Sequence, residues 1–106
     1  MPVVGDIARR VRSKNAGPFW LTIDLFCGDD AGFERLRAGL DTAAVARAFQ
    51  VEEAVLRRFD IADLKVIKIS LPRPVVQGAR ADRDMHGAGF AEIIRRLPLA
   101  DAQARP

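Results

Sequence analysis

The chain has 106 residues, of which 49% are hydrophobic and 29% charged, as is typical of one globular domain. No apolar run approaches the roughly 20 residues that a membrane helix needs, which argues against a membrane protein. The start of the chain lacks the basic and apolar segments of a secretory signal, and a single cysteine, Cys27, excludes an intramolecular disulfide. We therefore expect a cytoplasmic protein.

The net charge of +3, with a pI near 9.7, points toward anionic partners. Basic residues cluster near the start of the chain at Arg9, Arg10, Arg12 and Lys14. Such a cluster can bind the phosphates of nucleic acid, but no aromatic residues interleave with it as a base-stacking platform requires. A solvated helix face is the simpler interpretation, and nucleic-acid binding is kept as a minor alternative.

Residues 6–13 predict a short helix, because Ile7 and Val11 would share one face of it while the arginines would point away. The pair Gly17-Pro18 would end this helix.

Residues 19–27 alternate in the manner of a strand and carry large apolar groups at both sets of positions, which is typical of a strand covered on both faces. Asp24 lies in the middle of this strand. A buried carboxylate needs a positively charged partner, since an unpaired buried charge is costly. Lys14 and Arg73 are the expected partners. Asp24 is then either a ligand-orienting or acid/base group, or one half of an internal ion pair.

Helices are predicted between this strand and the next. Asp29 or Asp30 can cap a first helix that Gly39 ends, and Asp41 can cap a second. Apolar residues at helical spacing predict a further helical piece over residues 51–59.

A second strand is predicted over residues 64–71 from its β-branched residues. A connection through helices favours a parallel, right-handed pairing of the two strands. Two strands alone make a poor sheet, so a third strand from residues 72–77, or an edge borrowed from a partner, is also expected.

The last predicted helix covers residues 87–96, with Ile93 among its inward residues. The predicted fold class is thus α/β: a small single domain over residues 1–98, with two or three strands and crossover helices packed on the sheet. Residues 99–106 are expected to form a flexible tail.

A carboxylate or phosphate is the ligand class that the polar loops favour, because cationic and amide donors suit an anion. The candidate ligand-binding residues are Ser13, Lys14, Asn15, Gly17, Arg73 and Gln77. The glycine would allow a close approach of the backbone to the ligand. The alternative for the first three of these residues is a helix C-cap.

A second polar loop carries Asp82, Asp84 and His86 at alternate positions, and oxygen and imidazole ligands suit a divalent metal. Asp84 can instead cap the following helix, and His86 can form a hydrogen bond at its start. No other cofactor is expected. The sequence has no P-loop, no dinucleotide fingerprint and no complete nucleophile motif around Cys27.

Several of these segments together resemble a known family. They are residues 12–19 (Arg-Ser-Lys-Asn-Ala-Gly-Pro-Phe), 72–74 (Pro-Arg-Pro), 77–78 (Gln-Gly) and 82–88 (Asp-Arg-Asp-Met-His-Gly-Ala). The chain resembles, over nearly its whole length, the small proteins of unknown function that accompany AtuA-type acyclic terpene utilisation proteins, as neighbours or fused at their C-terminus. The resemblance implies a small subunit that completes a larger protein in the catabolism of branched or hydroxylated acids.

Two functional hypotheses follow. In the first, the chain is an accessory subunit that associates with a larger AtuA-type protein, or with copies of itself, and contributes to a site for a small anionic ligand. No stand-alone activity is expected. In the second, the chain is part of a two-component lyase or hydro-lyase in which Asp24 or His86 performs acid/base chemistry.

Overall fold

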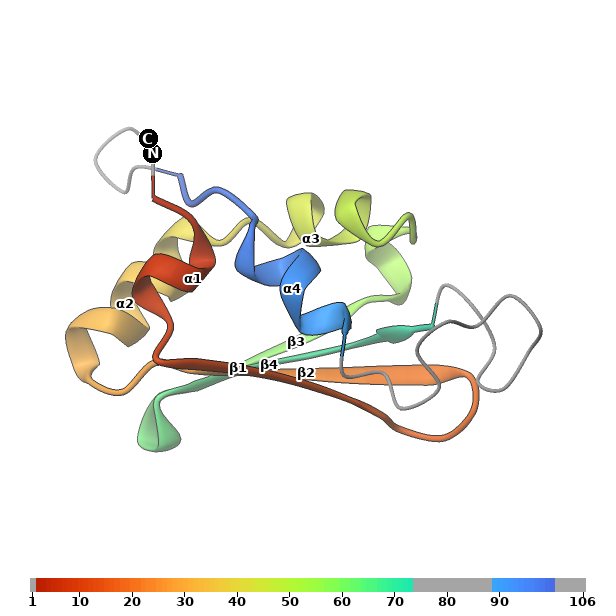
Figure 1. Ribbon diagram of the computed structural model, residues 1–106, viewed down its shortest axis with the longest axis horizontal. Coiled ribbons are helices and arrows are strands. Elements are labelled where there is room, and N and C mark those ends of the chain that lie inside the picture. The colour runs from red at the N-terminus through yellow and green to blue at the C-terminus, as the bar shows by residue number, and fades with distance from the viewer. Residues whose placement is uncertain (1, 74–88, 101–106) are drawn as a thin grey trace.

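The computed structural model describes residues 2–73 and 89–100. In this part of the chain, a four-stranded sheet lies against one layer of helices, as Figure 1 shows. The elements in chain order are α1 (Val4–Ile7), β1 (Arg10–Asn15), β2 (Trp20–Phe26), α2 (Asp30–Gly39), α3 (Thr42–Ala48), η1 (Glu53–Val55), β3 (Arg57–Ile61), η2 (Ala62–Leu64), β4 (Val66–Pro72) and α4 (Phe90–Arg95). The fold is α/β as predicted, but it has four strands instead of two or three.

The sheet is antiparallel throughout, with the strand order β1-β2-β4-β3. It consists of two hairpins, β1–β2 and β3–β4, whose inner strands β2 and β4 pair along their whole length. The predicted parallel pairing of these two strands is wrong. That prediction took the connection between them to be entirely helical, whereas β3 reverses the chain once more before β4 begins.

The first hairpin replaces most of the helix predicted over residues 6–13. Helix α1 ends at Ile7, and the chain is extended in β1. Val11 and Ser13 are buried while their strand neighbours are exposed, which is the two-residue period of a strand. Over so few residues the sequence pattern does not separate helix from strand, and the pairing with β2 decides between them.

The prediction of a helix over residues 51–59 is also wrong. This segment contains a single turn, η1, followed by the start of the edge strand β3. Lys65, with φ of 53°, is the left-handed residue that returns the chain from η2 into β4. The third strand predicted from residues 72–77 is not found within the described residues: β4 includes Pro72, and residues 74–77 lie outside them.

The two long helices begin at aspartates, as predicted. Asp29 Oδ1 accepts a hydrogen bond from the Gly32 amide at 2.7 Å, and Asp41 Oδ1 accepts one from the Ala43 amide at 3.1 Å. Each such N-cap stabilises a helix by about 1 kcal/mol. Gly39 is the last residue of α2, also as predicted. None of the described helices is long and apolar enough to cross a membrane.

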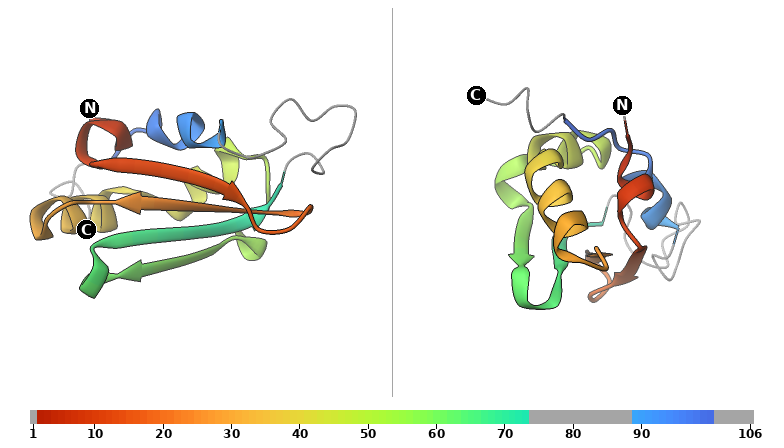
Figure 2. Two further views of the ribbon diagram at one scale, coloured as in Figure 1. Left: turned by 60° about the horizontal axis from the view of Figure 1, so that its bottom comes forward. Right: turned by 90° about the vertical axis from the view of Figure 1, so that its left-hand side faces the viewer.

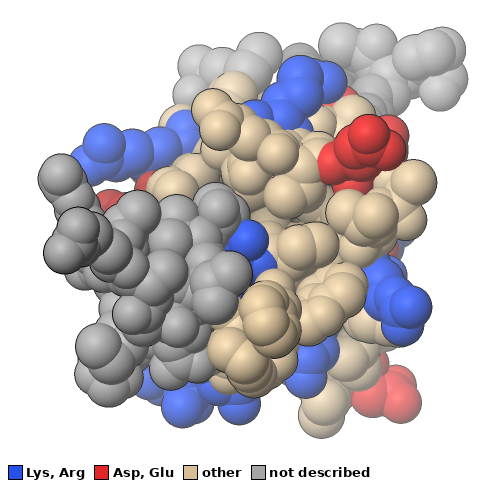
Figure 3. Space-filling model, turned by 90° about the vertical axis from the view of Figure 1, so that its right-hand side faces the viewer, with Lys and Arg blue, Asp and Glu red and all other residues tan. Residues whose placement is uncertain are grey.

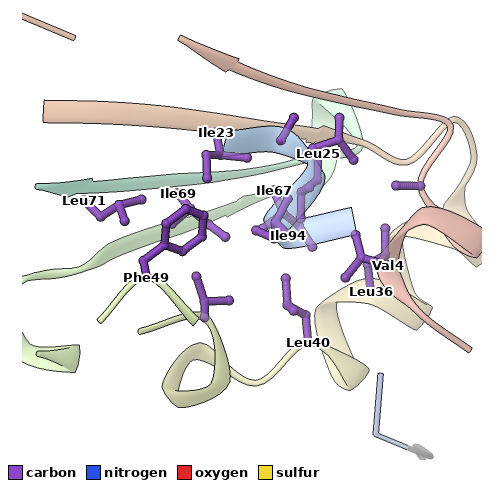
Figure 4. Close-up of a cluster of buried hydrophobic side chains, with 14 of the residues drawn as sticks. Val4, Ile23, Leu25, Leu36, Leu40, Phe49, Ile67, Ile69, Leu71 and Ile94 are labelled. Atoms are coloured by element: carbon purple, nitrogen blue, oxygen red, sulfur yellow. The ribbon is translucent and has the colours of Figure 1, made fainter. Parts of the chain in front are cut away.

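The core lies between the sheet and the helices (Figure 4). The labelled side chains from the sheet are Ile23, Leu25, Ile67, Ile69 and Leu71, and those from the other elements are Val4, Leu36, Leu40, Phe49 and Ile94. All of them are at most 2% exposed. Because burying one such side chain contributes roughly 1.5–3 kcal/mol, this cluster holds the helices on one face of the sheet.

No described helix lies on the opposite face, which comes toward the viewer in the left view of Figure 2. We call it the open face. Its side chains are Arg10, Arg12 and Lys14 from β1; Trp20, Thr22, Asp24 and Phe26 from β2; Val66, Lys68, Ser70 and Pro72 from β4; and Arg57, Phe59 and Ile61 from β3. For the expectation that β2 is covered on both faces, the described residues provide no helix on the open side, although Thr22 is buried there and Asp24 and Phe26 are half-buried. The apolar residues Trp20 and Phe26 suggested burial, but basic residues on the other strands share this face with them.

The end of the described chain is more ordered than the sequence suggests. Helix α4 lies within the predicted range 87–96, with Ile94 fully buried. Ile93, predicted to point inward, is instead 37% exposed, because neighbouring residues on a helix point in different directions. Leu99, at the start of the predicted tail, is buried, and its amide donates to the carbonyl of Pro2 at 2.8 Å.

Candidate functional site

One end of the sheet brings several predicted ligand residues together. We call it the hairpin end: it comprises the β1–β2 turn at residues 16–19, the end of β4 and the start of α4. Backbone hydrogen bonds close it, from Ala16 N to Trp20 O at 2.9 Å and from Arg73 N to Phe19 O at 2.8 Å. Strand pairing thus continues past β4 and fixes the position of the Arg73 backbone.

Arg73 is buried at the hairpin end and contacts α4. Its side chain is 7% exposed and lies on the helix-covered side of the sheet, with Cζ 5.3 Å from the centroid of the Phe90 ring. Phe90 in turn packs on Phe49, with ring centroids 6.3 Å apart and the rings tilted by 50°. A cation–π contact contributes about 0.5–2 kcal/mol. The contact also orients the planar guanidinium, whose N–H donors suit carboxylate and phosphate.

Ser13 and Asn15 lie on the same side of the sheet as Arg73. Ser13 is buried and Asn15 is half-buried. Asn15 lies opposite Leu21, which lies opposite Leu71 on the next strand, and Arg73 follows two residues later. Because every second residue of a strand shares a face, the amide and the guanidinium occupy neighbouring rows. The Asn15 amide thus lies in the row next to Arg73, and the Ser13 hydroxyl lies one row further from the hairpin end.

Lys14 and Gly17 are placed differently. Lys14 lies opposite Thr22 on the open face, across the sheet from Arg73. Gly17 has φ of +88°, and a Cβ there would meet no atom within 4 Å. The turn itself therefore requires glycine, whether or not a ligand approaches it. The helix C-cap interpretation of this segment is wrong, because its residues belong to β1.

Asp24 lies at the centre of the open face. Its cross-strand neighbours are Arg12 on β1 and Lys68 on β4. Directly opposite residues have Cβ atoms about 4.5–5.5 Å apart, so these two cations, and not the expected Lys14 or Arg73, surround the carboxylate. Since Asp24 and Arg73 point to opposite sides of the sheet, one copy of the chain does not present both to the same small ligand.

The other predicted site residues lie outside the described part of the chain: Gln77, Asp82, Asp84 and His86. Within residues 2–73 and 89–100, no group of three or more His, Cys, Asp or Glu side chains is arranged to hold a metal ion. The proposed metal ligands and the acid/base role of the histidine remain predictions.

Cys27 follows β2 and is buried, with its Sγ 3.7 Å from the carbonyl oxygen of Leu25. Burial, together with the negative charges of Asp29 and Asp60, raises the pKa of the thiol to about 11. The thiol is then protonated at neutral pH and is a poor nucleophile. We therefore assign Cys27 to the core.

A hollow of about 410 Å³ lies between α1 and the start of α2, and Asp6, Asp29 and Arg35 help to line it. Both carboxylates already bind helix-start amides: Asp6 Oδ2 accepts from Val3 N at 2.9 Å, and Asp29 Oδ1 accepts from Gly32 N at 2.7 Å. The acidic residues here are thus explained by local capping.

Two features of the structure were missed in the sequence. The contact between Arg73 and Phe90 joins segments that are distant in sequence, and no local pattern predicts it. The basic side chains on β1 did leave a signal, because Arg10, Arg12 and Lys14 recur at every second residue. That period indicates one face of a strand and not a helix.

Comparison with protein-family models gives a match over most of the chain. The model of DUF4387, a domain of unknown function, matches residues 4–97. Neither a curated protein nor a solved structure matches the chain. The matched range includes the whole sheet, the open face and the hairpin end. The chain therefore belongs to the domain of unknown function family DUF4387.

Proposed function

We propose that this chain is an accessory domain that associates with a larger AtuA-type acyclic terpene utilisation protein and contributes a cationic group to a carboxylate or phosphate site. The motifs at residues 12–19 and 72–74 motivate the choice of partner, through the resemblance described above. The resemblance also supplies the setting, which is the catabolism of branched or hydroxylated acids.

The single observation that supports this proposal best is the position of Arg73. Its guanidinium is buried, packs on the Phe90 ring and lies on the same side of the sheet as Ser13 and Asn15. The paired N–H donors of a guanidinium match two oxygens of one anion, and the single ammonium group of a lysine does not. The Asn15 amide, in the neighbouring row of the same face, is the nearest neutral donor among the predicted ligand residues on β1.

The association is tested with tagged chain co-expressed with the AtuA-type protein. The proposal expects the two to co-purify and to form a complex of defined stoichiometry in sedimentation. A chain that stays free of this protein at micromolar concentrations would contradict the accessory role.

The ligand site is tested on the assembled complex with a panel of branched and hydroxylated carboxylic acids. Arg73→Gln is expected to weaken ligand binding at least about tenfold, and Arg73→Lys to weaken it less, because charge survives while the paired donors are lost. Arg96→Gln, at an exposed position after α4, is the matched control and should bind as the wild type does. Unchanged binding by Arg73→Gln, in a variant whose circular dichroism is normal, would remove Arg73 from the site.

A further inference from the structure

The open face collects the excess positive charge of the chain. Among the residues that the structure describes, five basic residues and one acidic residue lie on this face. The basic and acidic residues in the rest of the described chain balance to within one charge. Lys and Arg side chains are visible along the lower edge of the molecule in Figure 3, the edge at which the open face lies.

The basic side chains are arranged around the single carboxylate. Arg12 and Lys68 lie directly across the strands from Asp24. Lys14 and Arg57 lie in the next row, across from Thr22 and Ser70, which are opposite each other. Among the described residues, the two central rows of the open face thus present four basic side chains, the Asp24 carboxylate and, at the β3 edge, the exposed Phe59.

Along the strand direction, further apolar side chains lie in the rows on either side of these central rows. At one end, Phe26, Val66 and Ile61 form a continuous row across three strands, and Arg10 lies over the Phe26 ring with Cζ 6.0 Å from the centroid. At the other end, 38% of the Trp20 side chain is exposed, beside the end of β4. Aromatic residues and arginine together are the composition that protein–protein interfaces favour.

The same arrangement disfavours two other occupants. A second copy of the chain, placed face to face, would bring like charges together. A single nucleic-acid strand needs a run of stacking aromatics along its path, whereas the aromatic residues of this face, Trp20, Phe26 and Phe59, lie in three separate rows of the sheet.

We propose that the open face is the surface by which this chain docks onto its larger partner. The partner would present an acidic surface opposite the central rows, with apolar groups opposite the apolar rows on either side of them. The inference rests on the proposed function, from which it takes the partner. It adds which surface is used and which chemistry the partner must offer. It also leaves Arg73, on the opposite side of the sheet, outside the docking contact.

The experiment is a calorimetric titration of purified AtuA-type protein with the purified chain and two double variants. The first, Arg57→Glu with Lys68→Glu, reverses two charges on the open face. The second, Arg47→Glu with Arg96→Glu, makes the same charge change at exposed positions on the helical side. The open-face variant is expected to lose at least about tenfold in affinity and the control less than about twofold, since opposed like charges disfavour a complex.

The outcomes separate the inference from the proposed function. If the wild-type chain and both variants bind equally well, the open-face assignment is overturned while the accessory role stands. If the wild-type chain does not bind the AtuA-type protein at all, the accessory role itself fails. The chain is also tested for binding to a single-stranded oligonucleotide and for self-association in sedimentation. If either one is strong and is abolished in the open-face variant, the face belongs to that occupant and the inference is overturned.

Discussion

The two faces of this sheet are built from alternate residues of the same strands, yet they have opposite surroundings. On the covered face, Ile23 and Ile69 lie opposite each other and are fully buried under the helices. One residue further along each strand, Asp24 and Lys68 lie opposite each other on the open face. A strand therefore does not have one environment, and the residues that hold the fold together are separable from those free to recognise a partner.

This separation has a practical consequence for mutagenesis. Substitutions on the covered face change the free energy of unfolding, because they remove packed groups or buried hydrogen bonds. Substitutions at exposed positions of the open face should leave stability nearly unchanged and affect only association.

The largest effect is expected from removing the same side chain on each face. Ile69→Ala, at a position with no exposed surface, should lower the free energy of unfolding by about 2–5 kcal/mol through the cavity it leaves. Ile61→Ala, on the open face, should lower it by about 1 kcal/mol or less. Urea denaturation followed by circular dichroism measures both. Equal losses would mean that the open face is packed as tightly as the core.

The next largest loss of stability is expected at one of two adjacent arginines of β3. Arg58 points to the covered side and donates to the carbonyl of Leu40, to Thr42 Oγ1 at 3.2 Å and to the carbonyl of Arg37 at 3.0 Å. It thereby ties the edge strand to the end of α2. Arg58→Ala should cost about 2–3 kcal/mol of stability, because several acceptors lose a charged donor.

The matched control is its neighbour on the open face. Arg57→Ala should change stability by no more than about 0.5 kcal/mol, as exposed substitutions generally do. Arg58→Lys should recover part of the loss, since one ammonium group does not reach all the acceptors. The same denaturation measurement applies, and equal stability of the Arg57 and Arg58 variants would refute the assignment of these residues to different faces.

The smallest effect concerns the protonation of Cys27. Because the folded chain holds the thiol pKa at about 11, against 9.0 for an ordinary thiol, the folded state keeps a proton that the unfolded state releases between these values. Stability should therefore be unaffected by this group below about pH 9 and should decrease as the pH rises toward 11.

Comparing the wild type with Cys27→Ala at several pH values isolates this contribution from those of other groups. The difference in stability between the two should be constant up to about pH 9 and should then change in favour of the variant. Fast reaction of Cys27 with a thiol reagent at neutral pH, in folded protein, would contradict both its burial and its raised pKa.

The strands and helices with strong local signals were predicted from the sequence. The alternation in β2, the β-branched run in β4 and the aspartate caps of α2 and α3 each specify an element without help from the rest of the chain. The segments that became β1 and β3 were predicted as helices. Their apolar spacing is compatible with either structure, and only pairing with a neighbouring strand selects the extended form.

For the candidate site, the sequence supplied the residue types and the tertiary structure supplied their grouping. Arg73, Ser13 and Asn15 were recognised as candidate ligand groups because cationic, hydroxyl and amide donors suit an anion. That they share one side of the sheet, while Lys14 and Asp24 lie on the other, depends on strand register, which a single sequence does not specify.

Local patterns in the sequence are thus enough to predict the α/β class, the positive charge and the elements with a clear periodicity or cap. The tertiary structure alone decided that the sheet has four antiparallel strands, that helices cover one face of it, and that the excess charge collects on the other. The physical reason is that hydrogen bonding between strands and burial under helices depend on residues far apart in the chain. Alternation within a strand indicates that its two faces differ, but not which of them the helices will cover.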